Sequence, residues 1–214
     1  MTTGLLTIGN RRYSSWSLRG WLATRLAGLD CETRVIWLDE PGYKEAIAKV
    51  SPAGTVPVLD HDGVTVGDSF AIGLYLAERF PAAGFWPADR HARAEAYALT
   101  AEMHAGFSAL RRDLPMDLGR RGVPRAEAAG PELERDLARI AAIWSAVPSR
   151  PGSFLFGKPG LVDCFYAPVA SRLRSYAVPL PGPAADYAAT LLDWPLFREW
   201  EAEAALETKV IANP

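Results

Sequence analysis

Two short stretches of this sequence combine residues that could bind a small peptide-like ligand. The first spans residues 51–59, SPAGTVPVL, in which a proline directly precedes an apolar strand pattern. Because proline lacks an N–H and normally stands at the first residue or the edge of a strand, the backbone of Val56 is free to bond another group. The second begins at Asp68 and Ser69, a pair that opens an apolar helical pattern. Backbone amides, a helix N-terminus and a carboxylate together suit a ligand that carries both a carboxylate and an amine.

The elements that must position these residues change in kind near residue 81. Before it, strand patterns at 5–8, 33–38, 56–60 and 64–66 alternate with helical patterns at 17–29, 43–50 and 69–80. The order β-α-β-α-β-β-α fits a small mixed sheet covered by helices. After it only helical spacing remains, at 89–114, 125–146, 161–176, 187–192 and 196–206. We therefore predict an α/β domain over 1–81, a linker at 82–88 and an all-α domain over 89–214.

The bulk properties narrow the class of protein. A formal net charge of −2 over 214 residues gives no electrostatic reason to bind nucleic acid. No apolar run reaches membrane-spanning length, and the N-terminus is too short and polar for a signal peptide. The three histidines are scattered, and Cys31 and Cys164 form no C-x-x-C pair, so no metal site is expected. We expect a cytoplasmic protein that binds neither nucleic acid nor membrane.

Four landmarks in order make the chain resemble the cytosolic glutathione transferases over essentially its whole length. They are residues 13–19 (YSSWSLR), the two stretches described above, and residues 156–163 (FGKPGLVD) at the start of a predicted helix. The chain is similar to the serine-type branch, which includes zeta-class and related bacterial enzymes. The resemblance implies a thioredoxin-like domain, then an all-helical domain, with glutathione as co-substrate. It also implies a homodimer.

The serine-rich loop at 13–19 would activate the thiol of glutathione. A thiol with a pKa of about 8.5 is little ionised at neutral pH, and a hydroxyl donor at a helix N-terminus lowers that pKa. Ser14 is the catalytic hydroxyl if the loop is aligned on its serine pair, while Ser15 and Ser17 remain alternatives. Any of the three could instead be the helix N-cap. Tyr13 is a further hydroxyl, which we expect to line the pocket.

The glutathione-binding residues follow from the same resemblance. In the family the bond before Pro57 is cis, which turns the Val56 backbone to pair with the cysteinyl part of glutathione like an added strand. Ser69 and its amide would hold the γ-glutamyl carboxylate, and Asp68 would accept the ammonium group, either within one protomer or across a dimer contact. The alternative is that Asp68 or Ser69 is only a helix N-cap.

The glycine carboxylate of glutathione lacks its usual partner. Relatives commonly carry a lysine where this chain has Thr55. Lys44 and Lys49 are the available substitutes, and we prefer Lys44, although a solvated lysine is the alternative for each.

The candidates for a second-substrate pocket share an apolar or basic character near the serine loop: Tyr13, Trp16, Phe107, Leu110, Arg111 and Met116. The apolar side chains could line a pocket, while Arg111 could engage an anionic group. The alternative is core packing for Phe107, Leu110 and Met116 and solvent exposure for the arginine.

The start of the predicted helix over 161–176 departs from the family pattern. Gly160 stands where relatives have serine or threonine, three residues before Asp163. We expect Asp163 to be buried and structural, because it would receive backbone donors in the first turn.

The leading hypothesis is a glutathione transferase that attacks a small electrophile, as in detoxification. An isomerase of the maleylacetoacetate type and a glutathione peroxidase are alternatives within the enzymes. A transferase-like binding or scaffold protein without catalysis is the third possibility.

Overall fold

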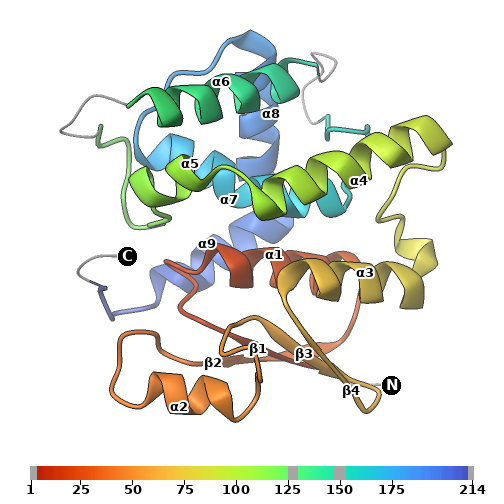
Figure 1. The fold of residues 1–214 in the computed structure, drawn as a ribbon, viewed down its shortest axis with the longest axis vertical. Coiled ribbons are helices and arrows are strands. Elements are labelled where there is room, and N and C mark those ends of the chain that lie inside the picture. The colour runs from red at the N-terminus through yellow and green to blue at the C-terminus, as the bar shows by residue number, and fades with distance from the viewer. Residues whose placement is uncertain (1–3, 125–129, 147–152, 212–214) are drawn as a thin grey trace.

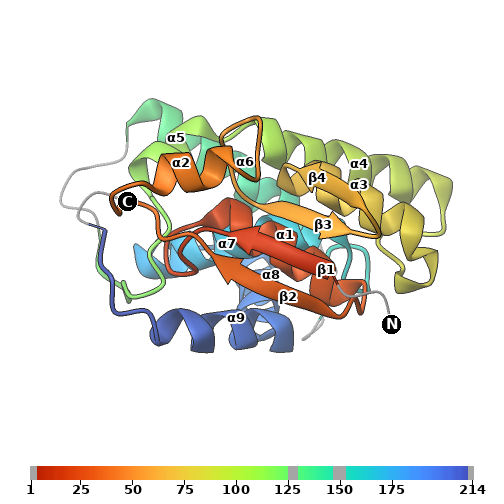
Figure 2. The same ribbon diagram turned by 90° about the horizontal axis from the view of Figure 1, so that it is seen from below.

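The computed structural model describes residues 4–124, 130–146 and 153–211. Its N-terminal part holds a four-stranded mixed sheet in the order β2-β1-β3-β4, made of β1 (Gly4–Ile8), β2 (Cys31–Val35), β3 (Val58–His61) and β4 (Val64–Gly67). β1 pairs in parallel with β2 and antiparallel with β3, and β3 forms a hairpin with β4 (Figure 2). β1 is therefore a central strand, and its Leu6 and Ile8 are fully buried.

Three helices cover this sheet: α1 (Ser15–Leu26), α2 (Tyr43–Ala48) and α3 (Ser69–Arg79). α1 and α3 lie on one face, whereas α2 lies on the other (Figure 1). The loop 9–14 joins β1 to α1, and Asp68 alone joins β4 to α3. Two glycines of these helices allow close approaches: a Cβ on Gly20 of α1 would stand 2.8 Å from Cγ of Pro57, and a Cβ on Gly73 of α3 would stand 2.6 Å from the side chain of Leu161.

The rest of the described chain is helical. After a 3-10 turn at Pro81–Ala83, the helices are α4 (Arg90–Ala105), α5 (Ser108–Asp113), α6 (Pro131–Ser145), α7 (Leu161–Ser175), α8 (Gly182–Asp193) and α9 (Pro195–Ala205). α7 is buried along nearly its whole length and packs against α1, α4 and α8. The predicted order, a β-α-β-α-β-β-α sheet unit followed by helices, is confirmed. The bounds 1–81, 82–88 and 89–214 stay a prediction.

Several helices begin or end at other residues than the sequence predicts. The pattern over 89–114 is two helices, because the chain breaks at Gly106 and at Phe107, which adopts a left-handed φ of 56°. The first helix begins at Ser15 rather than Ser17, with Ser14 as its N-cap. α8 begins at Gly182, five residues before the predicted start, because Pro183 suits a first helical turn. Of the helix predicted over 125–146, residues 125–129 lie outside the described residues.

No helix in the described ranges is both long enough and apolar enough to cross a membrane.

Candidate functional site

The loop before β3 contains Val56, whose backbone can bond a ligand. The Val56–Pro57 peptide bond is cis, as expected. Pro57 is buried against α1, where Gly20 leaves room for its ring. Val56 lies ahead of β3 and is half-buried. Within the described chain its N–H and C=O have no hydrogen-bond partner, so an extended ligand can pair with them.

The N-terminus of α3 carries two signs of a binding site. Asp68 caps the helix, its Oδ1 accepting from the N–H of Phe70 at 2.7 Å and of Ala71 at 3.2 Å. It does so with a φ of 72°, a left-handed conformation that is uncommon outside glycine and concentrates at functional sites. Ser69 is 0% exposed, yet its Oγ has no partner among the described residues. A buried hydroxyl without a partner needs an explanation, and a bound carboxylate would supply one.

His104 lies beside this helix end and was not expected there. Its Nε2 is 3.8 Å from Oδ2 of Asp68, and its ring meets Trp16 edge-on and Phe70 at a tilt. Burial lowers the pKa of His104, while Asp68 acts in the opposite direction. This contact was not predictable from the sequence, because a single histidine in a helix more often packs or faces solvent.

The three serines of the loop have different hydrogen bonds. Ser14 Oγ accepts from the N–H of Ser17 at 3.3 Å and donates to Ser17 Oγ at 2.8 Å, and Ser17 Oγ accepts from the N–H of Gly9. Ser14 and Ser17 are therefore tied to the start of α1. Ser15 is 4% exposed, and its Oγ accepts from Nη2 of Arg172 on α7 at 2.9 Å. The hydroxyl proton of Ser15 has no acceptor in the part of the chain described.

Trp16 lies between two arginines. The guanidinium of Arg19 is 4.6 Å and that of Arg111 is 4.8 Å from the ring centroid. Arg19 is 1% exposed, and its Nε and Nη1 have no partner among the residues described. Burial lowers its pKa well below the usual value, with Arg111 and Arg172 acting in the same direction.

Arg111 is half-buried and forms no ion pair with a carboxylate of the described residues. Its side chain donates to the backbone carbonyls of Gly106, Met103 and His104. Nη1 of Arg111 has no partner within the described ranges. None of the three neighbouring arginines, Arg19, Arg111 and Arg172, forms an ion pair with a described carboxylate, although Asp68 acts on Arg19 and Asp136 on Arg111 without direct contact. Three positive charges so close together favour an anion at this corner of the molecule.

The apolar pocket candidates are mostly inside the core. Phe107, Leu110 and Met116 are all buried, with Leu110 fully so. This burial supports the alternative of core packing. Tyr13 is also buried, with the guanidinium of Arg12 over its ring at 5.1 Å.

Lys44 is separate from the other candidates. It is exposed on α2, its Nζ 5.9 Å from the ring centroid of Tyr43, and no described contact joins it to Val56, Asp68 or Ser69.

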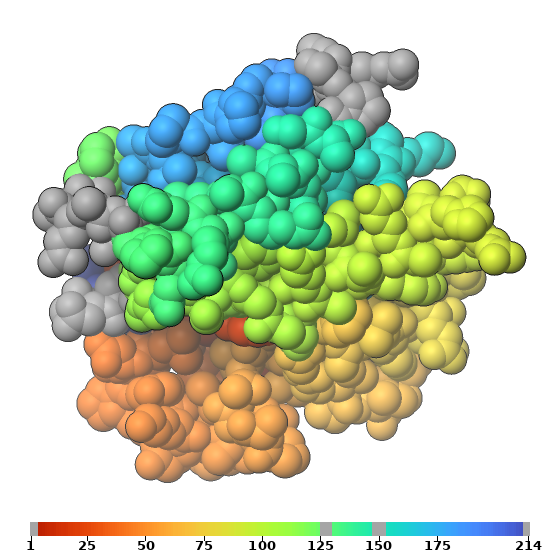
Figure 3. Space-filling model, turned by 45° about the horizontal axis from the view of Figure 1, so that its top comes forward, coloured from red at the N-terminus to blue at the C-terminus, as the bar shows by residue number. Residues whose placement is uncertain are grey.

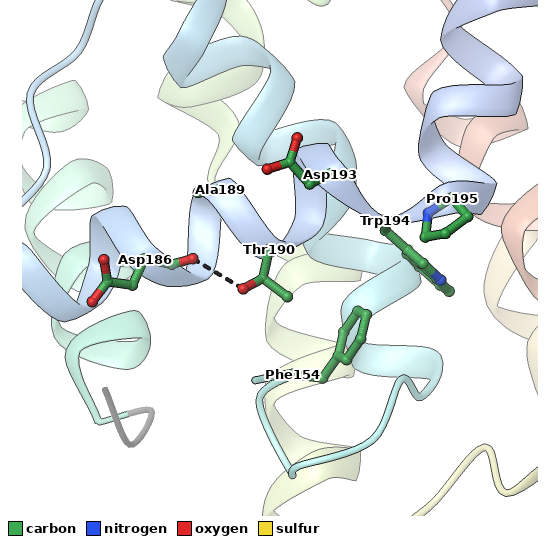
Figure 4. A pocket seen from close by; sticks show the side chains of 7 residues that line it. All are labelled: Phe154, Asp186, Ala189, Thr190, Asp193, Trp194 and Pro195. Atoms are coloured by element: carbon green, nitrogen blue, oxygen red, sulfur yellow. Dashed lines mark hydrogen bonds between the residues drawn. The ribbon is translucent and has the colours of Figure 1, made fainter. Parts of the chain in front are cut away.

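The molecular surface is hollowed between the sheet-bearing part of the chain and the first helices of the helical part (Figure 3). Figure 3 shows a recess between the orange segment that contains α2, the gold segment of α3 and the yellow-green α4–α5 segment. Red atoms, which belong to the described N-terminal segment, are visible in its depth. A different pocket, on α8 and the start of α9, is lined by Phe154, Asp186, Ala189, Thr190, Asp193, Trp194 and Pro195 (Figure 4). It contains none of the predicted site residues.

No group of three histidine, cysteine or acidic side chains gathers as metal ligands would within residues 4–124, 130–146 and 153–211. The expectation of a site without metal stays a prediction.

Comparison with known proteins identifies the family. The family model "Glutathione S-transferase, N-terminal domain" matches residues 13–79. A zeta-class glutathione S-transferase of Euphorbia esula is 30% identical over 159 residues, which is 72% of this chain and 70% of that protein. A maleylpyruvate isomerase of Ralstonia sp. is 29% identical over 179 residues, covering 78% and 84% of the two chains.

Other matches are partial or concern the fold. The glutathione S-transferases Z2 and Z1 of Arabidopsis thaliana are matched over only 43% and 38% of their own lengths. Among solved structures, a Burkholderia glutathione transferase homolog with bound glutathione superposes with a TM-score of 0.74 at 24% identity, over 95% of this chain and 98% of that one. The chain therefore belongs to the glutathione S-transferase family, in its zeta-like branch.

Proposed function

We propose that this protein binds glutathione and stabilises its thiolate with the hydroxyl of Ser15 for attack on a small electrophile. The observation that carries the proposal is the bonding of Ser15. Its Oγ is buried at the first residue of α1 and accepts from Arg172, so its own proton is available to a ligand. A hydroxyl that donates to a thiolate, at the positive end of a helix, lowers the pKa of the thiol.

The binding residues are those of the two loops beside α1. The free backbone of Val56 pairs with the cysteinyl part of glutathione, as an added strand would. The unpartnered hydroxyl of Ser69 and the N-terminus of α3 hold the γ-glutamyl carboxylate. Asp68 accepts the ammonium group through Oδ2, since its Oδ1 already caps α3. Lys44 remains our candidate for binding the glycine carboxylate. Its ammonium group is exposed on α2.

Ser14 has the weaker case as the thiol-facing hydroxyl. Its proton goes to Ser17 and its oxygen caps α1. We assign it to positioning of the first turn, and Ser14→Ala is therefore the matched control for Ser15→Ala.

The arginines favour an acidic electrophile. Arg111 and Arg19 flank Trp16 without a carboxylate partner in the described chain. An unsaturated acid could place its carboxylate here while the thiolate adds to its double bond. The addition turns the double bond into a single bond and leaves an enolate. Rotation about this single bond and expulsion of the thiolate return glutathione and the geometric isomer, whereas protonation of the enolate carbon by solvent gives the conjugate. A relative is a maleylpyruvate isomerase, so the isomerase is the second candidate.

The experiment that tests the proposal combines glutathione binding by calorimetry with turnover of an unsaturated acid and of a neutral electrophile. We expect binding in all three proteins, wild type, Ser14→Ala and Ser15→Ala. Turnover should fall by about 10²-fold or more in Ser15→Ala, because one donor to a developing or held anion has that effect. Binding without turnover in the wild type would select the scaffold function instead. Absence of glutathione binding would overturn the proposal.

Quaternary structure and location stay predictions. We propose a homodimer, which sedimentation equilibrium tests directly, since a monomer at micromolar concentration would contradict it. The cytoplasmic location is tested by fractionation of the source cells.

A further inference from the structure

Arg172 is a buried cation whose only described bonds are to neutral oxygens. It belongs to α7 and is 6% exposed. Its Nη1 donates to the carbonyl of Leu114 at 2.5 Å, and its Nη2 donates to Ser15 Oγ at 2.9 Å. No carboxylate of the described residues forms an ion pair with it. A buried charge without a counterion destabilises the folded protein, which indicates that Arg172 has a functional role.

The surroundings of Arg172 lower its pKa but leave the side chain charged at neutral pH. Burial lowers its pKa to about 10, with the nearby Arg111 acting in the same direction and Tyr176 opposing. It therefore carries its charge at neutral pH. Two other arginines interact electrostatically with it, Arg111 and Arg19, and no described carboxylate is among the groups that shift its pKa.

The bond from Arg172 fixes where the proton of Ser15 can point. A serine hydroxyl has one O–H donor and two acceptor lone pairs. With one lone pair of Ser15 occupied by Nη2 of Arg172, the proton must be directed away from the guanidinium. Accepting a bond from a cation also polarises the O–H and makes it a better donor. Ser14 has no such partner, because its contacts are to Ser17.

We propose that Arg172 is the positioning residue of thiol activation, holding the Ser15 hydroxyl so that its proton faces the sulfur of glutathione. This inference rests on the proposed function of Ser15. α7 lies against α1 (Figures 1 and 2), and 157 positions separate the two residues. The helical part thus contributes to activation of the thiol through a bond to the first turn of α1.

The test is the pKa of the thiol of bound glutathione, followed by thiolate absorbance against pH. The variants are Arg172→Gln, Arg172→Lys, Ser15→Ala and the double variant Arg172→Gln/Ser15→Ala. Arg174→Gln is the matched control, because Arg174 stands on the same helix but pairs with Glu201. Thermal unfolding shows whether each variant is folded. If Arg172→Gln does not fold, the thiol pKa in Arg172→Lys is compared with that of the wild type instead.

We expect Arg172→Gln to raise the thiol pKa by about one unit, and Arg172→Lys, which keeps a charged donor, to recover part of that shift. Arg174→Gln should leave it unchanged. In the double variant the shift should equal that of Ser15→Ala alone, because Arg172 acts through Ser15.

Three results would overturn the inference, and each can be distinguished from the others. If Ser15→Ala raises the thiol pKa but folded Arg172→Gln and Arg172→Lys do not, Arg172 has no positioning role while the proposed function survives. If Ser15→Ala itself leaves the thiol pKa unchanged, the assignment of Ser15 fails and the role of Arg172 fails with it. Additive shifts in the double variant would show a direct electrostatic effect on sulfur instead of positioning.

Discussion

The serines of this site fall into two groups, those whose hydroxyl already makes its hydrogen bonds within the protein and those whose hydroxyl can still bond a ligand. Ser14 and Ser17 are bonded to each other and to the start of α1, whereas Ser15 and Ser69 each keep an unused hydroxyl proton or an unpartnered oxygen. Unused capacity in a buried position is where a ligand bond is gained at little cost to the folded protein.

Ser69→Ala should separate binding from stability. Removing a buried hydroxyl that has no partner among the described residues should change the free energy of unfolding by less than about 0.5 kcal/mol. Glutathione affinity should fall about tenfold, equivalent to about 1.4 kcal/mol. Ser171→Ala is the matched control, since Ser171 is equally buried but donates to the carbonyl of Pro168 at 2.7 Å. It should lose stability and keep affinity, and the reverse pattern would contradict a ligand role for Ser69.

The sequence predicted part of this residue-scale picture. The stretches at 51–59 and at Asp68 follow local rules for strands and helix caps, so Val56 and Ser69 could be located from neighbours alone. The choice between Ser14 and Ser15 could not be made, because the partner that distinguishes them, Arg172, is remote in the sequence. Arg19 and His104 were not recognised as site neighbours for the same reason.

At the scale of elements, the start of α7 explains the departure at Gly160. A Cβ there would lie 2.8 Å from the carbonyl oxygen of Phe85, which accepts the N–H of Leu161 at 3.0 Å. Asp163 accepts from the N–H of Gly160 at 2.8 Å, the N–H of Leu155 at 3.1 Å and the hydroxyl of Tyr187 at 2.6 Å. The cap is complete without a side chain at its first position. The helix was predictable from the sequence, but the reason for its glycine was not.

Gly160→Ser should destabilise the protein by about 1–3 kcal/mol, because the new Cβ overlaps the backbone of residue 85. Gly130→Ser is the control at another helix N-cap, where a Cβ would meet nothing within 4 Å. That variant should be neutral or slightly stabilising. Urea unfolding measures both, and equal effects in the two variants would show that the contact with Phe85 is unimportant.

Asp163 should give the protein a pH-dependent stability. Burial raises its pKa from an unperturbed value of 3.8 to about 6, although its three donors act in the opposite direction. Between these two values the native state binds more protons than the unfolded state, so the free energy of unfolding falls as pH rises through this window. The whole effect is about 3 kcal/mol.

Asp163→Asn lacks this titration and is the reference for it. The stability of the wild type minus that of Asp163→Asn, from urea unfolding, should decrease between about pH 4 and pH 6 and be constant above about pH 7. A difference independent of pH would show that the carboxyl is ionised throughout.

On the scale of the whole molecule, the C-terminal residues are tied to the serine loop. Glu207 follows α9, and its Oε1 and Oε2 accept from the N–H groups of Arg11 and Arg12 at 2.7 and 3.1 Å. Trp200 on α9 donates to the carbonyl of Arg11 at 3.1 Å. In Figure 1, α9 and the segment after it run beside the start of α1. The order of elements was predictable from local patterns, but this closure was not, because it joins residues nearly two hundred positions apart.

Glu207→Ala should remove the hydrogen bonds that join the segment after α9 to Arg11 and Arg12. Two partly buried N–H groups lose a charged acceptor, so we expect a loss of about 1–3 kcal/mol of stability and a raised KM for glutathione. Glu203→Ala is the control, since it breaks only a half-exposed ion pair with Arg11, which is worth about 0–1 kcal/mol. Thermal unfolding and steady-state kinetics compare the two, and identical behaviour would contradict a role for Glu207 in holding the loop.

The pKa of the thiol of glutathione bound to wild type, Ser15→Ala and Ser14→Ala tests the central claim most directly. We predict a wild-type value below that of the free thiol, raised by about 1–2 units in Ser15→Ala and nearly unchanged in Ser14→Ala. A rise in Ser14→Ala alone would transfer the role to Ser14. A wild-type value equal to that of free glutathione would contradict thiol activation by this site.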